Sequence, residues 1–308
     1  MSYTKKEFAA PSSDGIHTLS GVVYIPEGKA CGFFHVVHGM TEHIGRYDRF
    51  MSAIAENGYI CFGYDHLGHG NTVKDKSELG FIAHKNGYDL LCRDVKVFSD
   101  AVRGEFDGEN TLPYYLMGHS MGSFVVRLAT ERYVRPDKLI IMGTGGANPA
   151  AGVGLALISL IKLFKGEKHI SSFVENIAFG SYNSRFKNDA DADSKSWLTT
   201  DKRVREKYIN DDFCTFKFTV SAMGDLMRLL KSCNRGAWFK TLPKIPLLLV
   251  AGEDDPVGNY GKGVLGVEAK LKKHSHNVEC HLYKGARHEI LNDFCYEQLK
   301  NDILSFIG

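Results

Sequence analysis

The fold of this chain is decided by one stretch, YYLMGHSMGS, at residues 114–123. An apolar run passes through Gly118, Ser120 and Gly122, in the pattern Gly-x-Ser-x-Gly, and continues at once into an amphipathic helical pattern. This order predicts a strand, a sharp turn and a helix. Because glycines allow the strand and helix to pack closely, we expect the Ser120 hydroxyl to stand clear of the sheet beside free N–H groups. The alternative is a glycine turn that merely contains a serine, and the flanking pattern favours the first interpretation.

Strand-like and helical patterns alternate on both sides of this stretch. We expect further strands at 5–10, 17–26, 32–39, 59–65, 138–142, 245–252 and 277–284. Helical periodicity is present at about 47–56, 90–102 and 262–274, and again at the C-terminus. Such alternation is typical of a mostly parallel sheet covered by helices on both faces. The sequence therefore predicts an α/β fold with an eight-stranded sheet.

Residues 146–236 interrupt this alternation, since they show helical patterns and almost no strand signal. We expect residues 1–145 and 237–308 to form the core and 146–236 to form a helical cap over the carboxyl ends of the strands, where α/β sheets bind ligands. The apolar segment at 150–164 is interpreted as a lid or acyl-binding wall or as an ordinary core helix, and both can be true at once. Exposed apolar surface on the cap would serve peripheral membrane contact or homodimer formation.

Composition narrows the classes of function. The net charge of +2 over 308 residues gives no basic field for nucleic acid, and no basic stripe interleaved with aromatics is present. The seven cysteines form an odd set without Cys-x-x-Cys spacing, which indicates a reducing compartment and neither a disulfide scaffold nor a zinc site. The first residues lack the apolar core of a signal peptide. We therefore expect a soluble, cytoplasmic protein.

A serine nucleophile needs an adjacent base, and that base needs a group to orient it. The strand at 245–252 is followed by Asp254 and Asp255, and the strand at 277–284 is followed by His288. The chain order Ser, Asp, His is the one found in α/β-hydrolases. We interpret Ser120 as nucleophile, His288 as general base and then acid, and Asp255 as the carboxylate that fixes the imidazole. Asp254 is the alternative to Asp255.

Acyl transfer also needs N–H donors for the developing oxyanion. The backbone N–H of Met121, directly after Ser120, is one candidate, and the N–H of Met40, after the strand at 32–39, is the other. Neighbouring residues receive structural interpretations. His66 and His69 lie in a glycine loop without a third metal ligand. Trp197 and Phe213 are interpreted as core of the cap.

Five ordered blocks of sequence carry a resemblance to a known family. The chain resembles the monoacylglycerol lipase and bacterial lysophospholipase group of α/β-hydrolases, within the broad family of serine aminopeptidase-type hydrolases. The matching blocks are His38-Gly39-x-x-Glu42-His43-x-x-Arg46-Tyr47, Asp65-His66-x-Gly68-His69-Gly70, Gly118-His119-Ser120-Met121-Gly122-Ser123, Gly252-x-x-Asp255-Pro256-Val257 and Gly285-Ala286-Arg287-His288-Glu289. A second histidine, three residues after the catalytic one in some animal members, is Leu291 here.

The resemblance implies a serine hydrolase that acts on carboxylic esters, often glycerol esters or lysophospholipids, without metal or cofactor. In that group the positions of Glu42 and Arg46 lie near the glycerol end of the substrate; an Arg–Glu pair that braces the oxyanion loop explains the same residues. The substrate expected here is a single-chain lipid ester. Alternatives are another acyl class, such as hydroxycinnamoyl esters, aminopeptidase-type cleavage, or a ligand-binding protein on a hydrolase scaffold.

Overall fold

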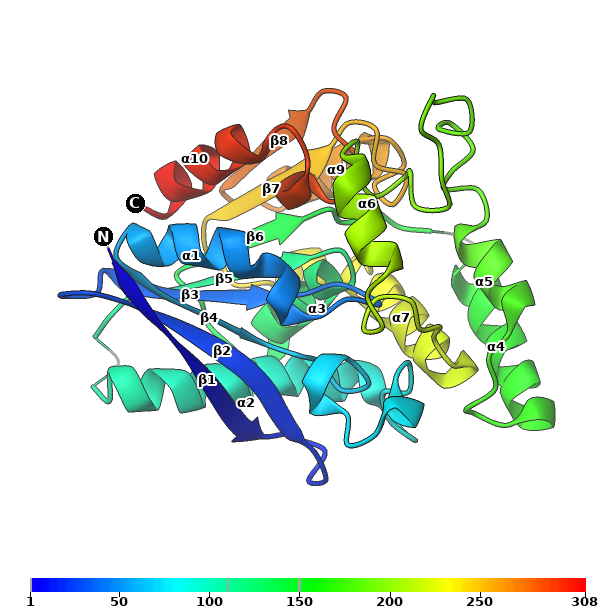
Figure 1. The fold of residues 1–308 in the computed structure, drawn as a ribbon, viewed down its shortest axis with the longest axis horizontal. Helices are drawn as coiled ribbons and strands as arrows, with labels where there is room; N and C mark the ends of the chain where they lie inside the picture. Colours follow the sequence, from blue (N-terminus) through cyan, green and yellow to red (C-terminus); the bar gives the residue numbers. More distant parts are fainter. Residues whose placement is uncertain (1, 110, 149–150) are drawn as a thin grey trace.

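A sheet of eight strands runs through the centre of the molecule in the order β1-β2-β4-β3-β5-β6-β7-β8 (Figure 1). The structure, a computed structural model, describes residues 2–109, 111–148 and 151–308, so the first residue of the apolar segment expected at 150–164 lies outside the described residues. β2 pairs antiparallel with β1 and β4, and the other neighbours are parallel. The strands are β1 Tyr3–Pro11, β2 Thr18–Pro26, β3 Gly32–Val37, β4 Tyr59–Tyr64, β5 Tyr114–His119, β6 Lys138–Met142, β7 Leu247–Gly252 and β8 Val278–Tyr283.

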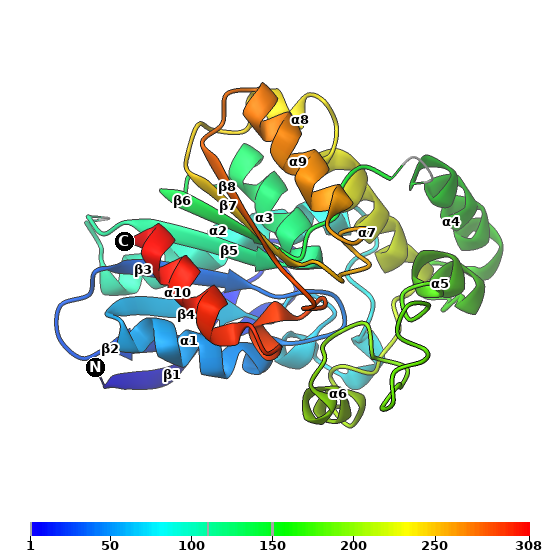
Figure 2. The same ribbon diagram turned by 90° about the horizontal axis from the view of Figure 1, so that it is seen from above.

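Helices cover both faces of this sheet (Figure 2). They are α1 Asp48–Glu56, α2 Gly87–Phe106, α3 Met121–Arg132, α4 Ala151–Lys165, α5 Ser172–Phe179, α6 Lys202–Ile209, α7 Val220–Cys233, α8 Trp238–Thr241, α9 Lys262–Lys273 and α10 Tyr296–Ile307. Short 3-10 helices are η1 Ile44–Tyr47, η2 Gly70–Thr72, η3 Lys76–Glu78 and η4 Ile290–Asn292. The predicted eight-stranded, mostly parallel sheet with helices on both faces is confirmed.

The two faces of the sheet bury separate apolar clusters. α1 and α10 pack against one face, while α2, α3 and α9 pack against the other. Successive strand side chains point to opposite faces, so Phe33 enters one cluster and Phe34 the other. β3, β4, β5 and β7 are buried along their whole length, as expected of parallel strands covered twice.

Helices α4–α7 lie between β6 and β7 in the chain, and Figure 1 places them beyond the carboxyl ends of the parallel strands. α7 packs on α2 and α3, and α4 packs on α7. We call residues 151–233 the α4–α7 segment.

A buried arginine ties together the two places where this segment leaves and rejoins the core. Arg127 on α3 is fully buried, and its guanidinium donates to Thr144 Oγ1 at 3.3 Å and to the carbonyl of Gly145 at 3.4 Å. The same group donates to the carbonyl of Cys233 and to Asn234 Oδ1, at the end of α7. The chain that precedes the α4–α7 segment, at Thr144 and Gly145, and the end of α7 are therefore both fixed to α3.

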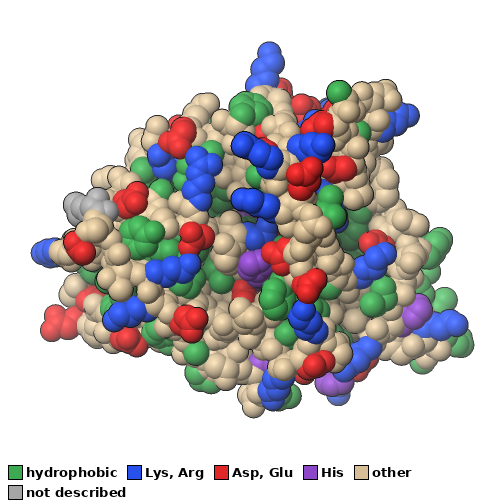
Figure 3. Space-filling view, viewed as in Figure 1, with side chains coloured by type: hydrophobic (Ala, Val, Ile, Leu, Met, Phe, Trp, Pro, Cys, Tyr) green, Lys and Arg blue, Asp and Glu red, His purple; other side chains and the backbone are tan. Residues whose placement is uncertain are grey.

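The described surface carries charges of both signs, and Figure 3 shows Lys/Arg and Asp/Glu side chains intermixed over the viewed face. The seven cysteines are all free thiols. In the described ranges, no helix combines the length and the apolar content that crossing a bilayer requires.

The close contact between β5 and α3 gives a test with a matched control. A Cβ atom on Gly118 would lie 2.3 Å from the carbonyl oxygen of Gly122, whereas a Cβ on Gly266 in α9 would meet nothing within 4 Å. We expect Gly118→Ala to lower the free energy of unfolding by about 3 kcal/mol because backbone must move. Gly266→Ala should raise it by about 1 kcal/mol through helix propensity. Denaturant unfolding measures both, and equal effects would contradict this interpretation.

Candidate active site

Ser120 occupies the turn between β5 and α3 in a strained backbone conformation, with φ 54° and ψ −119°. A residue other than glycine adopts this region at a cost, and such residues cluster at functional sites. The turn is held by the Ser120 N–H, which donates to the carbonyl of Met142 at 3.0 Å, and by Ser123 Oγ, which donates to the Ser120 carbonyl at 2.5 Å. The Ser120 side chain is consequently presented at the end of the sheet.

Asp255 and His288 follow β7 and β8 and lie side by side. His288 Nδ1 is 2.9 Å from Asp255 Oδ2, and Asp255 Oδ1 accepts a hydrogen bond from the Val257 N–H at 2.8 Å. Asp255 is fully buried. Asp254 instead faces Arg185, with 3.9 Å between charged atoms, and is half exposed. The structure therefore brings Asp255, and not Asp254, to the histidine.

Ser120 and His288 line one cavity of about 1030 Å³, and Met40 and Met121 line it with them. Among the described residues, no hydrogen bond joins Ser120 Oγ to His288. In active sites without substrate this hydrogen bond is often long or poorly aligned. A Cβ on Gly143 would lie 3.3 Å from His288 Cε1, so the absence of a side chain there makes room for the imidazole. The predicted nucleophile and base thus meet at the same cavity wall.

The loop after β3 carries the amide of Met40, and hydrogen bonds of two buried histidines, His38 and His66, hold this loop in place. His38 donates from Nδ1 to the carbonyl of Gly39 at 2.8 Å, and the His66 N–H donates to His38 Nε2 at 3.0 Å. Burial lowers the pKa of His38 to about 3, so its ring is neutral. Met121 is the first residue of α3 and has no carbonyl one turn earlier to accept its N–H. Met40 and Met121 both line the cavity beside Ser120, and the role of their amides as oxyanion donors stays a prediction.

Glu42 holds the same loop from the other side. Its Oε1 accepts from the Gly39 N–H at 2.5 Å and from Tyr47 Oη at 2.7 Å, and its Oε2 accepts from Arg46 at 2.8 Å. A Cβ on Gly39 would lie 3.0 Å from Ser120 Cβ, so this loop touches the turn that carries the serine. These contacts are those expected of a brace for the oxyanion loop. Glu42 also lines the cavity, and substrate contact by Glu42 stays a prediction.

Arg46 lies between two carboxylates. It donates to Glu42, and through both terminal nitrogens to Glu289 at 2.8 and 2.7 Å. The sequence reasoning missed Glu289, although its place directly after His288 was a usable signal. Burial would lower the pKa of Arg46, but the charges of Glu289 and Glu42 outweigh it and raise the pKa. Arg46 itself is absent from the described lining of the cavity.

His119 was also missed as part of this network. Its Nδ1 lies 2.8 Å from Tyr47 Oη and 3.3 Å from Glu42 Oε1, and its Nε2 lies 3.3 Å from the carbonyl of His288. Burial would lower the pKa of His119, but the hydrogen bond and charge of Glu42 raise it. An imidazolium at this position would donate from both ring nitrogens and link the loops after β3 and β8.

The walls of the cavity are of two kinds. Aliphatic side chains come mainly from α3, α4, α5 and α7, and the stretch between α5 and α7 supplies most of the polar side chains together with Trp197, Leu198, Phe216 and Phe218. The apolar lining includes Phe124, Leu157, Ile158, Val174, Phe179, Met223, Leu226, Met227 and Leu230, and the polar lining includes Glu175, Asn183, Ser194, Lys195 and Lys217. Only Ala151 and Ile158 of α4 are buried. Ile158 packs in the main apolar cluster and also lines the cavity, so α4 contributes to the core and to the cavity wall at once.

The contacts of Trp197 extend beyond its own segment. It packs against the small cluster of Leu198, Tyr208 and Cys214, as a core residue would, but it also lines the cavity. Its ring centre lies 5.1 Å from that of His288 at an interplanar angle of 35°. Trp197 therefore packs with its own segment, as the core interpretation expects, and in addition lies against the imidazole of His288.

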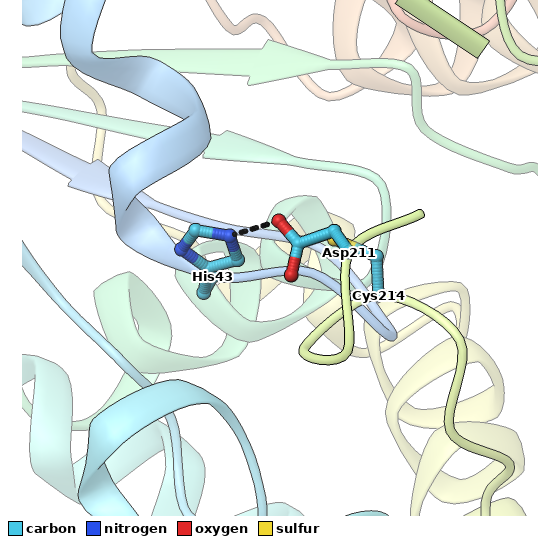
Figure 4. Close-up of side chains that lie close together, drawn as sticks. All are labelled: His43, Asp211 and Cys214. Carbon is cyan, nitrogen blue, oxygen red and sulfur yellow. Dashed lines mark hydrogen bonds and ion pairs between the residues drawn. The ribbon is translucent and has the colours of Figure 1, made fainter. Parts of the chain in front are cut away.

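One group of ligand-type side chains stands close together in the part of the chain that the structure describes. Figure 4 shows His43, Asp211 and Cys214, whose ligand atoms lie within 4.8 Å of one another. His43 Nε2 is 3.0 Å from Asp211 Oδ2, so the imidazole and the carboxylate are hydrogen-bonded to each other. Burial raises the pKa of the Cys214 thiol. The contact joins the loop after β3 to the segment after α6, whereas His66 and His69 belong to no such group among the described residues.

Comparison with known proteins adds a family and several relatives. The family model described as Serine aminopeptidase, S33 matches residues 28–294. A monoacylglycerol lipase of Mycolicibacterium smegmatis is 25% identical and aligns over 100% of this chain and 98% of its own. The human monoglyceride lipase is 25% identical over 85% of this chain and 77% of its own. A carboxyl esterase of Bacillus coagulans in complex with glycerol is 28% identical, with a TM-score of 0.91 over 99% and 98% of the two chains.

The charge of Glu42 gives a prediction on stability. Burial would raise the pKa of Glu42, but its hydrogen bond to His119 and the charges of His119 and Arg46 hold that pKa well below the ordinary 4.5. The carboxylate therefore stabilises the fold above about pH 4.5, and this contribution is lost as the pH falls further. We expect Glu42→Gln to lower the free energy of unfolding by about 3 kcal/mol at pH 7.

Urea unfolding gives the free energy of unfolding of each protein. The difference in this free energy between wild type and Glu42→Gln should become smaller as the pH falls from 4.5 towards 3.5. Glu206→Gln, on the exposed face of α6, is the matched control and should show no such narrowing. A difference for Glu42→Gln that is constant from pH 7 to 3.5 would show that its charge does not stabilise the fold.

Proposed function

The chain belongs to the serine aminopeptidase S33 family of hydrolases, and on that premise we propose that it is a serine carboxylic-ester hydrolase similar to monoacylglycerol lipases and lysophospholipases. The proposal is carried by one observation: Ser120, in its strained turn, faces the same cavity as the buried pair of His288 and Asp255. A hydroxyl, an imidazole and a carboxylate in that relation perform acyl transfer.

Each of the three side chains has one role. Ser120 Oγ attacks the ester carbonyl while His288 Nε2 takes its proton, and the same imidazole then protonates the departing alcohol. Asp255 fixes the ring by accepting from Nδ1 and stabilises the imidazolium that forms. Water, activated by His288, hydrolyses the acyl-serine and returns Ser120 to its first state.

The amides of Met40 and Met121 are proposed to bind the oxyanion. Two N–H groups that point to the developing charge are worth several kcal/mol in such reactions, about 3 kcal/mol for one donor in the measured case. Their position depends on the Gly39–Glu42 hydrogen bond of 2.5 Å and on the start of α3. We propose that Glu42 and Arg46 act mainly by holding this loop.

We further propose that residues 146–236 form a cap and that the substrate is a single-chain lipid ester. The apolar lining from α3, α4, α5 and α7 is suited to an acyl chain, since the favourable energy of burying methylene groups grows with chain length.

The carboxylates that line the cavity are paired with cations, and this argues against an aminopeptidase. The described lining contains Glu42, Glu175 and Glu289, and each is already paired with a cation: Glu42 and Glu289 with Arg46, and Glu175 with Lys217 at 2.8 Å. A substrate amine would need a carboxylate that is open to it. The nearby polar lining therefore favours an ester over a peptide with a free N-terminus.

The outer face of α4 and α5 is unusually apolar. Its exposed side chains are Val153, Leu160, Leu163, Phe164, Phe173 and Ile177. Figure 3 shows hydrophobic side chains at the right-hand edge, where Figure 1 places these helices. We propose that this face contacts a lipid surface, with a homodimer through the same face as the alternative. Cosedimentation with vesicles and size-exclusion chromatography separate the two.

The first prediction on activity concerns the nucleophile. We expect Ser120→Ala to lower kcat on a short p-nitrophenyl ester by roughly 10⁶-fold, as in the measured serine protease case. The wild type should react with a fluorophosphonate probe, and the variant should not. Ser77→Ala, at an exposed position in η3, is the control and should keep full activity. Retained turnover in Ser120→Ala, or no labelling of the wild type, would refute the proposal and favour a ligand-binding protein.

The second prediction concerns the acyl group. We expect kcat/KM to rise from four-carbon to twelve-carbon p-nitrophenyl esters and to be low for a hydroxycinnamoyl ester. Leu157→Glu, which places a charge in the apolar lining, should lower the value for the long ester at least tenfold more than for the short one. Leu163→Glu, on the exposed side of the same helix, should keep the wild-type profile. A profile that peaks at four carbons, or highest activity on the hydroxycinnamoyl ester, would favour the esterase alternative.

A further inference from the structure

Lys195 places a cation in the wall of the cavity that Ser120 and His288 also line. The stretch that follows it is bonded to the core, because the Glu289 N–H donates to the carbonyl of Leu198 at 2.7 Å and the His288 N–H faces the carbonyl of Trp197 at 3.4 Å. The backbone of Lys195 is itself fixed, since its N–H donates to Asp193 Oδ1 at 2.7 Å. The base of this side chain therefore has a defined position relative to His288.

The ammonium group of Lys195 has no acidic partner in the part of the chain that the structure describes. Among the described residues it makes no ion pair and donates no hydrogen bond, and its Nζ lies 5.0 Å from the centre of the Tyr208 ring. The other lysine of the lining, Lys217, is by contrast paired with Glu175. Burial lowers the pKa of Lys195, and the charges of Glu175 and Glu289 only partly offset it. An anion in the cavity would supply the partner that the protein does not.

The position of Tyr208 indicates which part of a substrate would meet this cation. Tyr208 Oη donates to the carbonyl of Thr41 at 2.9 Å, and Thr41 directly follows Met40 in the oxyanion loop. The ammonium of Lys195 thus lies over a ring that contacts the oxyanion loop, on the polar side of the cavity. Most of the aliphatic lining comes from α3, α4, α5 and α7, and the acyl chain would lie against these helices. The alcohol part of the ester is then the part that faces Lys195.

We propose that Lys195 recognises a negative charge on the alcohol part of the ester, a phosphate on glycerol being the group it fits, and so favours anionic single-chain esters over neutral ones. The inference rests on the proposed function for its substrate, although binding alone can test it. An ammonium group binds phosphate as a compact charge with three donors. Because the Lys195 side chain is partly buried, this hydrogen bond between charged groups is stronger than on the surface.

The test uses two ether analogues that cannot be hydrolysed, 1-O-dodecylglycerol and 1-O-dodecylglycerol 3-phosphate, below their micelle concentrations. Isothermal titration at pH 7.5 gives the dissociation constant of each for the full chain. We expect the phosphate compound to bind more tightly, and Lys195→Gln to reduce this preference roughly 10- to 100-fold, as for a lost hydrogen bond between charged groups. Lys195→Arg should keep most of the preference. Lys187→Gln, an exposed lysine of the same segment, should keep all of it.

Three results would overturn the proposal: tighter binding of the neutral ether by the wild type, an unchanged preference in Lys195→Gln, or an equal loss in Lys195→Arg. The binding measurement does not require turnover, so its outcome is independent of whether Ser120 is a nucleophile. The corresponding esters, 1-lauroylglycerol and its 3-phosphate, then give the ratio of kcat/KM values. That ratio should fall with Lys195→Gln by the same factor as the ratio of dissociation constants.

Discussion

The strained backbone at Ser120 depends on how closely β5 and α3 can approach. A Cβ at Gly122 would lie 2.2 Å from the carbonyl oxygen of Val37, and one at Gly118 would collide with the backbone of Gly122. The positive φ of Ser120 costs roughly 1–3 kcal/mol. The buried strand and helix on either side offset that cost, because β5 is buried along its length and α3 over most of its residues. The serine is therefore held in one position before any ligand binds.

A second constraint fixes the loops around the serine relative to each other. Glu42, Arg46 and Glu289 are largely removed from water, and charges in that state cost several kcal/mol each unless they are paired. Arg46 and Glu289 stand 243 residues apart in the chain. Their ion pair holds the loop after β3, which carries the Met40 amide, against the loop after β8, which carries His288. The Met40 amide and His288, which we propose as oxyanion donor and base, are thus carried by loops that the same buried charges hold together.

The sequence allowed prediction of groups whose place follows from topology. Ser120, Asp255 and His288 each follow a parallel strand, and the carboxyl ends of parallel strands meet at one edge of a sheet. The contacts of Glu289 and His119 could not be predicted in this way, because they depend on how two loops turn towards each other. The environment of α4 could not be predicted either, because an apolar segment has the same sequence pattern whether it is buried or exposed. The boundaries of the cap remain a prediction.

The two parts of the α4–α7 segment that line the cavity differ in their contacts with the rest of the protein. Its polar side is bonded to the catalytic loops through the carbonyl of Leu198 and the hydroxyl of Tyr208. α4 and α5, by contrast, bury few residues and expose much of their apolar surface. Hydrogen bonds to a head group depend on direction, so a fixed wall suits them. Burial of the acyl chain that we propose depends on area and has no direction, so an apolar wall suits chains of different length.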